Sequence, residues 1–193
     1  MGRGRDLIDR WAARVGESAL QGLARSSGRS VEDVRAEAEA GERAWAALAA
    51  GDPDRATEVA NQILARDPED ASPLVSGQDH HAHLVRGLVR LRSGDDIGAE
   101  RELLAAGRPL DPSSALSSFG PNMLLAEALL RRGRPAAVVT YLDRCADFWR
   151  SPGGRRQLRR WQDDIAHGQV PTFGPNLVYG TGGADLAALR APS

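Results

Sequence analysis

The chain has 193 residues, of which 41% are hydrophobic, and this is enough apolar material for one well-buried domain or a short array of repeats. Its formal net charge of −1 excludes any argument from total charge for binding nucleic acid or an anionic membrane. The single cysteine, Cys145, excludes an internal disulfide framework, and its place between Leu142 and Phe148 at helical spacing predicts a position in the core.

Neither a membrane span nor a secretory signal is predicted. No run of eighteen apolar residues exists, and the stretch MGRGRDLIDRWAARVGESAL has no apolar segment free of charge. We therefore expect a cytoplasmic protein. Charge is unevenly distributed, because residues 31–70 are rich in acids whereas residues 131–160 are rich in arginine.

Residues 1–29 are predicted to form an N-terminal helix. Apolar residues recur there every three or four positions: Ile8, Trp11, Val15, Ala19 and Leu23. Ser30 then begins a second helix that runs to about Ala50, because its side chain can accept from exposed amides while Asp33 occupies the third helical position.

Three segments align on a turn glycine: AWAALAAGDPDRATEVANQILARDP, GLVRLRSGDDIGAERELLAAGRPLDP and AEALLRRGRPAAVVTYLDRCADFW. The glycines are Gly51, Gly94 and Gly133. Mostly small residues stand seven positions before and five positions after them: Ala44, Gly87 and Ala126, then Ala56, Ala99 and Val138. Small residues let two antiparallel helices approach closely, and glycine supplies the conformation that ends the first helix. The pattern predicts an array of helical hairpins.

These residues resemble the tetratricopeptide repeat (TPR) family, whose helix pairs carry small residues at these positions and often end in Asp-Pro, as at Asp67-Pro68 and Asp111-Pro112. The resemblance covers roughly residues 40–149, and the glycines are spaced more widely than the family's repeat of about 34 residues. The stretches HHAHLVRGLVRLRSGD, SFGPNMLLAEALL and FGPNLVY also resemble parts of functionally uncharacterised bacterial proteins of this helical type.

The resemblance implies an all-α fold in which antiparallel helical hairpins stack as a short solenoid over residues 30–167. The first helix and residues 154–167 would serve as its N- and C-terminal caps. It also implies a concave face that binds a peptide or a partner protein. Unfilled apolar faces on the terminal helices would permit a homodimer.

The basic stretch GGRRQLRRW could bind nucleic acid, with Trp149 and Trp161 stacking on bases. The alternative is the solvated face of a capping helix. Trp161 already belongs to an apolar stripe with Leu158 and Ile165, and no helix-turn-helix, zinc or RNA-recognition signature is present. The sequence therefore favours a protein partner with acidic residues over nucleic acid.

Three histidines, His80, His81 and His83, lie in QDHHAHLVRG. On a helix that begins at Ser76, His80 and His83 share a face and His81 points about a quarter-turn away. That geometry is poor for one metal ion, because zinc-binding helices place two imidazoles at positions i and i+4. We expect no metal and no cofactor, and we expect histidines that pack or donate hydrogen bonds.

The tetrapeptide FGPN occurs twice, at residues 119–122 and 173–176. Each copy combines an aromatic anchor, Phe119 or Phe173, with a Gly-Pro turn and an amide side chain, Asn122 or Asn176. In the first copy we expect Pro121 to begin a helix and Phe119 to staple the incoming chain onto the core.

Residues 168–193 follow the repeats as a segment that contains the second FGPN copy and a tail expected to be mobile. Only LVYG within it could form a short extended piece. Two interpretations of the FGPN copies stay open. Each is an independent turn, or the C-terminal segment folds back so that Asn122, Asn176 and the histidines line one pocket.

No phosphate-binding loop, nucleophile elbow or Cys-His pair is recognisable. We therefore expect a non-catalytic protein- or peptide-binding adaptor with candidate binding residues His80, His81, His83, Asn122, Asn176, Phe119 and Phe173. The alternative is a small biosynthetic or modifying enzyme whose pocket uses the histidines and the two FGPN loops.

Overall fold

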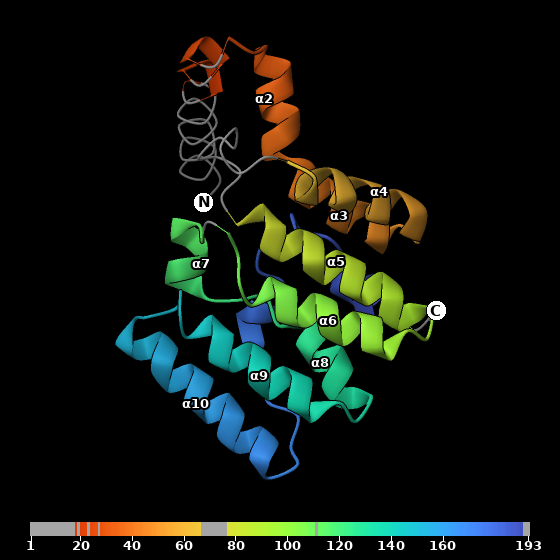
Figure 1. The fold of residues 1–193 in the computed structure, drawn as a ribbon, viewed down its shortest axis with the longest axis vertical. Coiled ribbons are helices and arrows are strands. Elements are labelled where there is room, and N and C mark those ends of the chain that lie inside the picture. Colours follow the sequence, from red (N-terminus) through yellow and green to blue (C-terminus); the bar gives the residue numbers. More distant parts are fainter. Residues whose placement is uncertain are drawn as a thin grey trace, which may run out of the picture. The chain divides into compact units, whose positions relative to one another are not determined.

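The computed structural model describes residues 28–66, 77–110 and 112–190, together with parts of residues 18–26. Within these residues the protein is all-helical and contains no β-strand, which confirms the predicted fold class (Figure 1). The chain divides into two compact units, residues 1–39 and 40–193. Most of the predicted N-terminal helix lies outside the described residues.

In the first unit, α2 (Val31–Ala38) begins as predicted, because the Ser30 hydroxyl accepts a hydrogen bond of 3.0 Å from the amide of Asp33. The prediction of one helix up to about Ala50 is wrong. Glu39 ends α2, and a separate helix, α3 (Ala40–Ala49), follows. Only small or charged residues stand between Val34 and Trp45, so no continuous apolar stripe holds the two pieces in one helix.

The second unit contains three antiparallel helix pairs, α3–α4, α5–α6 and α8–α9. Their bounds, beyond that of α3, are α4 (Pro53–Leu64), α5 (Gln78–Arg92), α6 (Asp96–Ala106), α8 (Leu124–Arg131) and α9 (Pro135–Cys145). Gly51, Gly94 and Gly133 form the corners with φ of 78°, 83° and 72°. Only glycine adopts this left-handed conformation without strain, and the prediction of equivalent corners is confirmed.

Close approach between helices explains the small residues of the three aligned segments. The six positions named for them are all buried. At Gly87 a β-carbon would lie 2.2 Å from a methyl group of Leu125, so α8 could not approach α5 with any larger residue there. Cys145 lies in the same core as predicted, where burial raises the pKa of its thiol and leaves it unreactive.

Helix α10 (Pro152–Ala166) packs against α9 at the far end of the pairs (Figure 1). Leu158, Trp161 and Ile165 are buried as predicted, while the four arginines of GGRRQLRRW are exposed. The short helix α7 (Ser114–Phe119) precedes α8. Pro121 does not begin α8, because the helix starts only at Leu124, whose amide donates to Oδ1 of Asn122.

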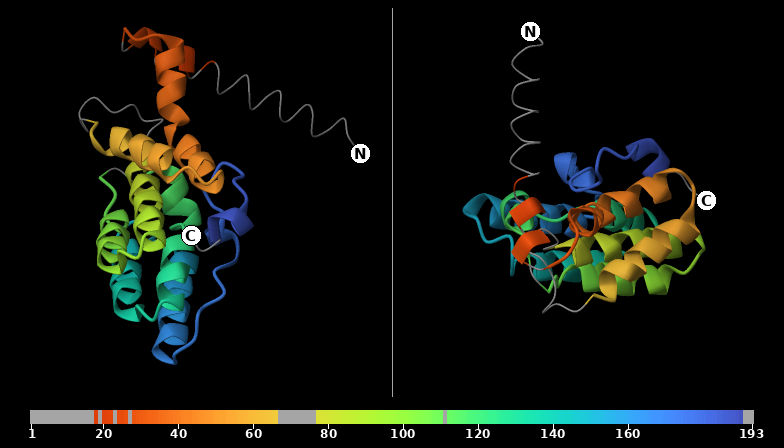
Figure 2. Two further views of the ribbon diagram at one scale, coloured as in Figure 1. Left: turned by 90° about the vertical axis from the view of Figure 1, so that its right-hand side faces the viewer. Right: turned by 90° about the horizontal axis from the view of Figure 1, so that it is seen from above.

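Residues 173–190, here called the C-terminal segment, return from α10 along the helix pairs (Figure 2). They contain a 3₁₀ turn, η3 (Gly174–Leu177), and a short helix, α11 (Leu186–Arg190), and the predicted extended piece at LVYG is instead 3₁₀ and turn. Where the sequence predicts a mobile tail, the structure packs Leu189 into the core, because that leucine would otherwise stay exposed.

The C-terminal segment lies on one face of the second unit, formed by α3, α5 and α8 and here called the first-helix face. Along this face the segment passes Met123 and His81 and reaches Glu42, and α11 then returns to Arg92 and Glu127. Among the described helices, none is long and apolar enough to cross a membrane.

Candidate functional site

His80 lies in the first turn of α5 and is fully buried. Its Nδ1 is 2.8 Å from the carbonyl oxygen of Ala106, which can only accept, so Nδ1 carries the proton. Its Nε2 then accepts a 3.2 Å hydrogen bond from the amide of Asn122. Burial lowers the pKa of His80 from 6.5 to about 4, and the imidazole is neutral with both nitrogens in use.

Asn122 is also fully buried, and it joins the first FGPN loop to the second. Its Nδ2 donates to the carbonyl oxygen of Tyr179 at 2.7 Å, while its Oδ1 accepts from the amide of Leu124 at 2.9 Å. Its own carbonyl oxygen accepts from the hydroxyl of Tyr141 at 2.9 Å. The amide side chain is therefore committed to holding the chain together.

Asn176 makes the reciprocal connection. Its Nδ2 donates to the carbonyl oxygens of Phe119 and Pro121 at 3.0 and 2.8 Å, and its own carbonyl oxygen accepts from the amide of Met123 at 2.8 Å. Each asparagine thus bonds to the main chain of the segment that holds the other. The interpretation of the two FGPN copies as independent turns is wrong.

His81 faces the C-terminal segment. Its Nδ1 lies 3.3 Å from Nε1 of Trp45, which donates to it, and its ring centroid is 6.0 Å from that of Tyr179. Burial among these rings, together with the neighbouring His80, lowers the pKa of His81 to about 3, although a little of the residue stays exposed to solvent. His81 is therefore a neutral packing residue that positions Tyr179.

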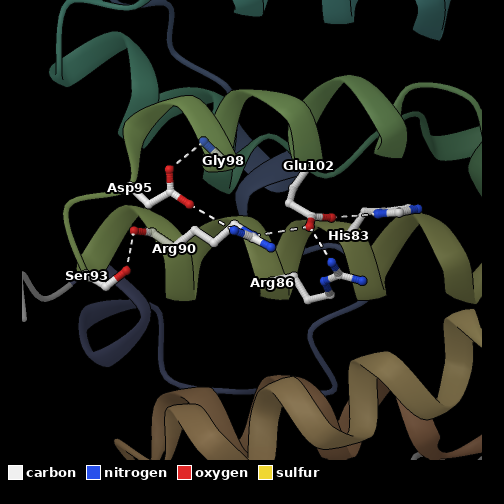
Figure 3. A network of polar contacts seen from close by, with 7 residues as sticks. All are labelled: His83, Arg86, Arg90, Ser93, Asp95, Gly98 and Glu102. Carbon is white, nitrogen blue, oxygen red and sulfur yellow. Dashed lines mark hydrogen bonds and ion pairs between the residues drawn. The ribbon is translucent and has the colours of Figure 1, made fainter.

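His83 does not join the other two histidines but belongs to an ion-pair network between α5 and α6 (Figure 3). Its Nδ1 and the guanidinium of Arg86 each lie 2.8 Å from the carboxylate of Glu102, and Arg90 lies 3.3 Å from it. Burial alone would raise the pKa of Glu102, but the hydrogen bond from His83 and the two arginine charges outweigh it and lower that pKa.

The two phenylalanines differ in their environments. Phe173 is buried against Trp161, with ring centroids 5.1 Å apart, and anchors the start of the C-terminal segment. Phe119 is 65% exposed and touches only the ring of Tyr179 among the aromatic contacts described, so the predicted staple onto the core is wrong. Gly120 turns the chain toward Asn122 and leaves Phe119 outside the core.

Three residues that the sequence analysis did not single out hold α11. Nη2 of Arg92 donates to the carbonyl oxygens of Ala188 and Leu189, at 2.9 Å each. Arg190 forms two hydrogen bonds, of 2.8 and 2.7 Å, with the two carboxylate oxygens of Glu127, which is only 5% exposed. Arginines and glutamates on helices are common, so no sequence signal marks these.

A cavity of about 350 Å³ adjoins α11 on the first-helix face. Its lining combines apolar and charged side chains: Leu88, Leu91, Arg92, Leu124, Glu127, Ala128, Arg131, Arg132, Leu189 and Arg190. Apolar walls with a few converging charged groups are typical of binding sites. Elsewhere in the described residues, no three His, Cys, Asp or Glu side chains are grouped so that they could hold a metal ion.

Neither the scan against protein-family models nor the searches of curated proteins and of solved structures finds a match to this chain.

Proposed function

We propose that this chain is a non-catalytic binding module of the TPR-like type, which takes a peptide or protein segment on its first-helix face. The observation that carries the proposal is that this face already holds a protein segment, residues 173–190 of the same chain. Three glycine-cornered helix pairs with small buried residues support the TPR-like part of the proposal.

The contacts on the first-helix face are of a kind that a foreign segment could also make. Arg92 donates hydrogen bonds to main-chain carbonyl oxygens, which every peptide carries. Main-chain contacts supply affinity that does not depend on sequence, whereas side-chain contacts such as that of Glu127 with Arg190 supply selectivity. The face therefore combines the two components of peptide recognition.

The enzyme alternative has weaker support. It needs His80 and Asn122 to face a substrate, but both are fully buried and their polar atoms bind protein groups. A general base works best with a pKa near the working pH, whereas burial lowers the pKa of His80 to about 4. The same residues that would form a pocket instead fix the C-terminal segment in place.

Site-specific photo-crosslinking in an extract of cells that express the chain tests the proposal. The crosslinker replaces Arg131, an exposed residue beside the cavity, in the full chain. Arg101 on α6 is the matched control, because it is also an exposed arginine on a helix and does not line that cavity. We expect discrete protein adducts from position 131 and none from position 101.

Each outcome of the crosslinking is informative. An adduct of twice the mass of the chain would identify a second copy as the partner. The proposal fails if position 131 gives no protein adduct. It also fails if positions 131 and 101 give the same adducts, because the first-helix face would then bind no more specifically than the surface of α6.

A further inference from the structure

We infer that the partner binds through a short helix in which two leucines stand three residues apart and an arginine follows the second leucine. This helix would take the place of residues 186–190, which lie against α3 and bond to Arg92 of α5 and Glu127 of α8. The inference rests on the proposed function and adds to it the chemistry of the partner segment. Its basis is the set of contacts that the chain's own α11 makes in that place.

The leucine requirement follows from α11. Leu186 and Leu189 stand one helical turn apart and lie on the same side of α11. Leu189 is 2% exposed, and Leu186 is partly buried against the core. A polar residue in place of Leu189 would lie beside Leu88 and Leu124, which line the same cavity, and one in place of Leu186 would lie against the core.

The arginine requirement follows from Glu127. This carboxylate is 5% exposed and receives both hydrogen bonds from one guanidinium, that of Arg190. Nη2 of Arg131, on the next turn of α8, lies 3.4 Å from Oε1 of Glu127. This contact is too long and the Arg131 side chain too exposed to replace the pairing with Arg190. Removing Arg190 would leave a buried charge poorly compensated, so any segment that replaces α11 must supply an arginine there.

The helical requirement follows from Arg92. Its guanidinium donates to the carbonyl oxygens of Ala188 and Leu189, which are among the last carbonyls of α11 and have no partner within that helix. A cation at this position also suits the negative end of a helix. Arg92 therefore recognises the C-terminal end of a helix, and an extended segment would not present two adjacent carbonyls to one nitrogen.

The chain's own α11 is a weak occupant of this place. It has five residues, far below the length at which a helix is stable by itself, and it follows Gly180, Gly182 and Gly183, all with positive φ. The cavity of about 350 Å³ beside Leu189 and Arg190 shows that α11 leaves apolar surface uncovered. A longer partner helix with the same three residues would bury more of this surface and displace α11.

A labelled peptide of residues 180–190 tests the inference when it is added to the full chain and its fluorescence anisotropy is measured. In the wild-type chain the tethered α11 competes at an effective concentration of about millimolar, so the peptide should bind weakly. The variant Arg190→Glu brings two carboxylates together and should release α11. We expect the peptide to bind this variant about tenfold more tightly than the wild-type chain.

Two further comparisons identify the contacts. Peptides with Leu189→Ala or Arg190→Glu should lose about tenfold in affinity for the Arg190→Glu chain. Adding Glu127→Arg to the Arg190→Glu chain restores an ion pair between the two positions with the charges exchanged. The chain's own α11 should then bind in its place again, and the peptide should bind this double variant more weakly. Circular dichroism of each chain confirms that it is folded.

The variant Gly180→Ala releases α11 without a change of charge, because its β-carbon would lie 2.2 Å from the ring of His81.

The inference is overturned if the peptide binds neither released chain more tightly than the wild type, or if the altered peptides bind as well as the original. That result would leave the proposed function standing if position 131 still gave protein adducts, because the face would then bind a segment of different chemistry. Loss of those adducts as well would overturn both.

Discussion

The substitution Asn122→Ala should destabilise the protein more than any other single amide-to-alanine change in the described residues. It removes the acceptor of the buried Leu124 amide and the donor to the partly buried carbonyl oxygen of Tyr179. Each lost hydrogen bond contributes about 1–1.5 kcal/mol net, so losing two should lower the free energy of unfolding by about 2–3 kcal/mol. For a chain of this size the melting temperature should fall by about 5–10 °C.

Urea denaturation followed by circular dichroism measures this loss. Asn61→Ala is the matched control, since Asn61 is exposed on α4 and its described hydrogen bonds are those of the helix main chain. Alanine favours a helix slightly more than asparagine does, so the control should change stability by no more than about 0.5 kcal/mol.

Amide hydrogen exchange shows which part of the chain is destabilised by Asn122→Ala. Because Asn122 holds the carbonyl of Tyr179, amides of the C-terminal segment should exchange faster in Asn122→Ala, while those of α4 should be unchanged. If Asn122→Ala and Asn61→Ala had equal stabilities, or if exchange rose throughout the second unit and not mainly in the C-terminal segment, the role assigned to Asn122 would be refuted.

Two other predictions concern charge. The pKa of His80 is about 4 in the folded chain and about 6.5 in the unfolded chain, so between these values only the unfolded chain binds a proton. About 3 kcal/mol of stability is therefore fully present above pH 6.5 and should be lost as the pH falls toward 4. Urea titrations at several pH values should show this loss in the wild-type chain and not in His80→Gln. His81 should add to the slope in the same direction, since its pKa is also lowered. Glu102→Gln should lower the free energy of unfolding by about 2 kcal/mol, because it removes the charge that His83, Arg86 and Arg90 share. The control Glu58→Gln should lower it by less than about 0.5 kcal/mol, because both side chains of the Glu58–Arg55 pair are about half exposed. An equal loss in both glutamine variants would contradict the role assigned to Glu102.

Local signals predicted the helix pairs well. Gly51, Gly94 and Gly133 each require a conformation that only glycine adopts easily, so their positions mark corners whatever the rest of the fold does. Ser30 likewise caps α2 by a contact three residues along the chain. Such features depend on near neighbours, and near neighbours are visible in the sequence.

Other features depend on partners far away in the chain. The break at Glu39 reflects a lack of long-range packing that capping patterns do not reveal. The exposure of Phe119 follows from how Gly120 directs the chain, and its aromatic character gives no hint of this. For the same reason Arg92, Glu127 and Arg190 could not be chosen from the sequence, because each gains its role only when α11 bonds to α5 and α8.

The two FGPN copies do form turns, but these turns are bonded to each other and so are not independent. Hydrogen bonds of Asn122 and Asn176 join the two loops, and this linkage determines where the C-terminal segment meets the first-helix face. Under the proposed function, α11 leaves its place while the FGPN linkage stays closed, because the glycine-rich turns after Tyr179 lie between them. Such a buried anchor joined to a weakly held helix would keep the competing segment close to the proposed binding face without blocking it permanently.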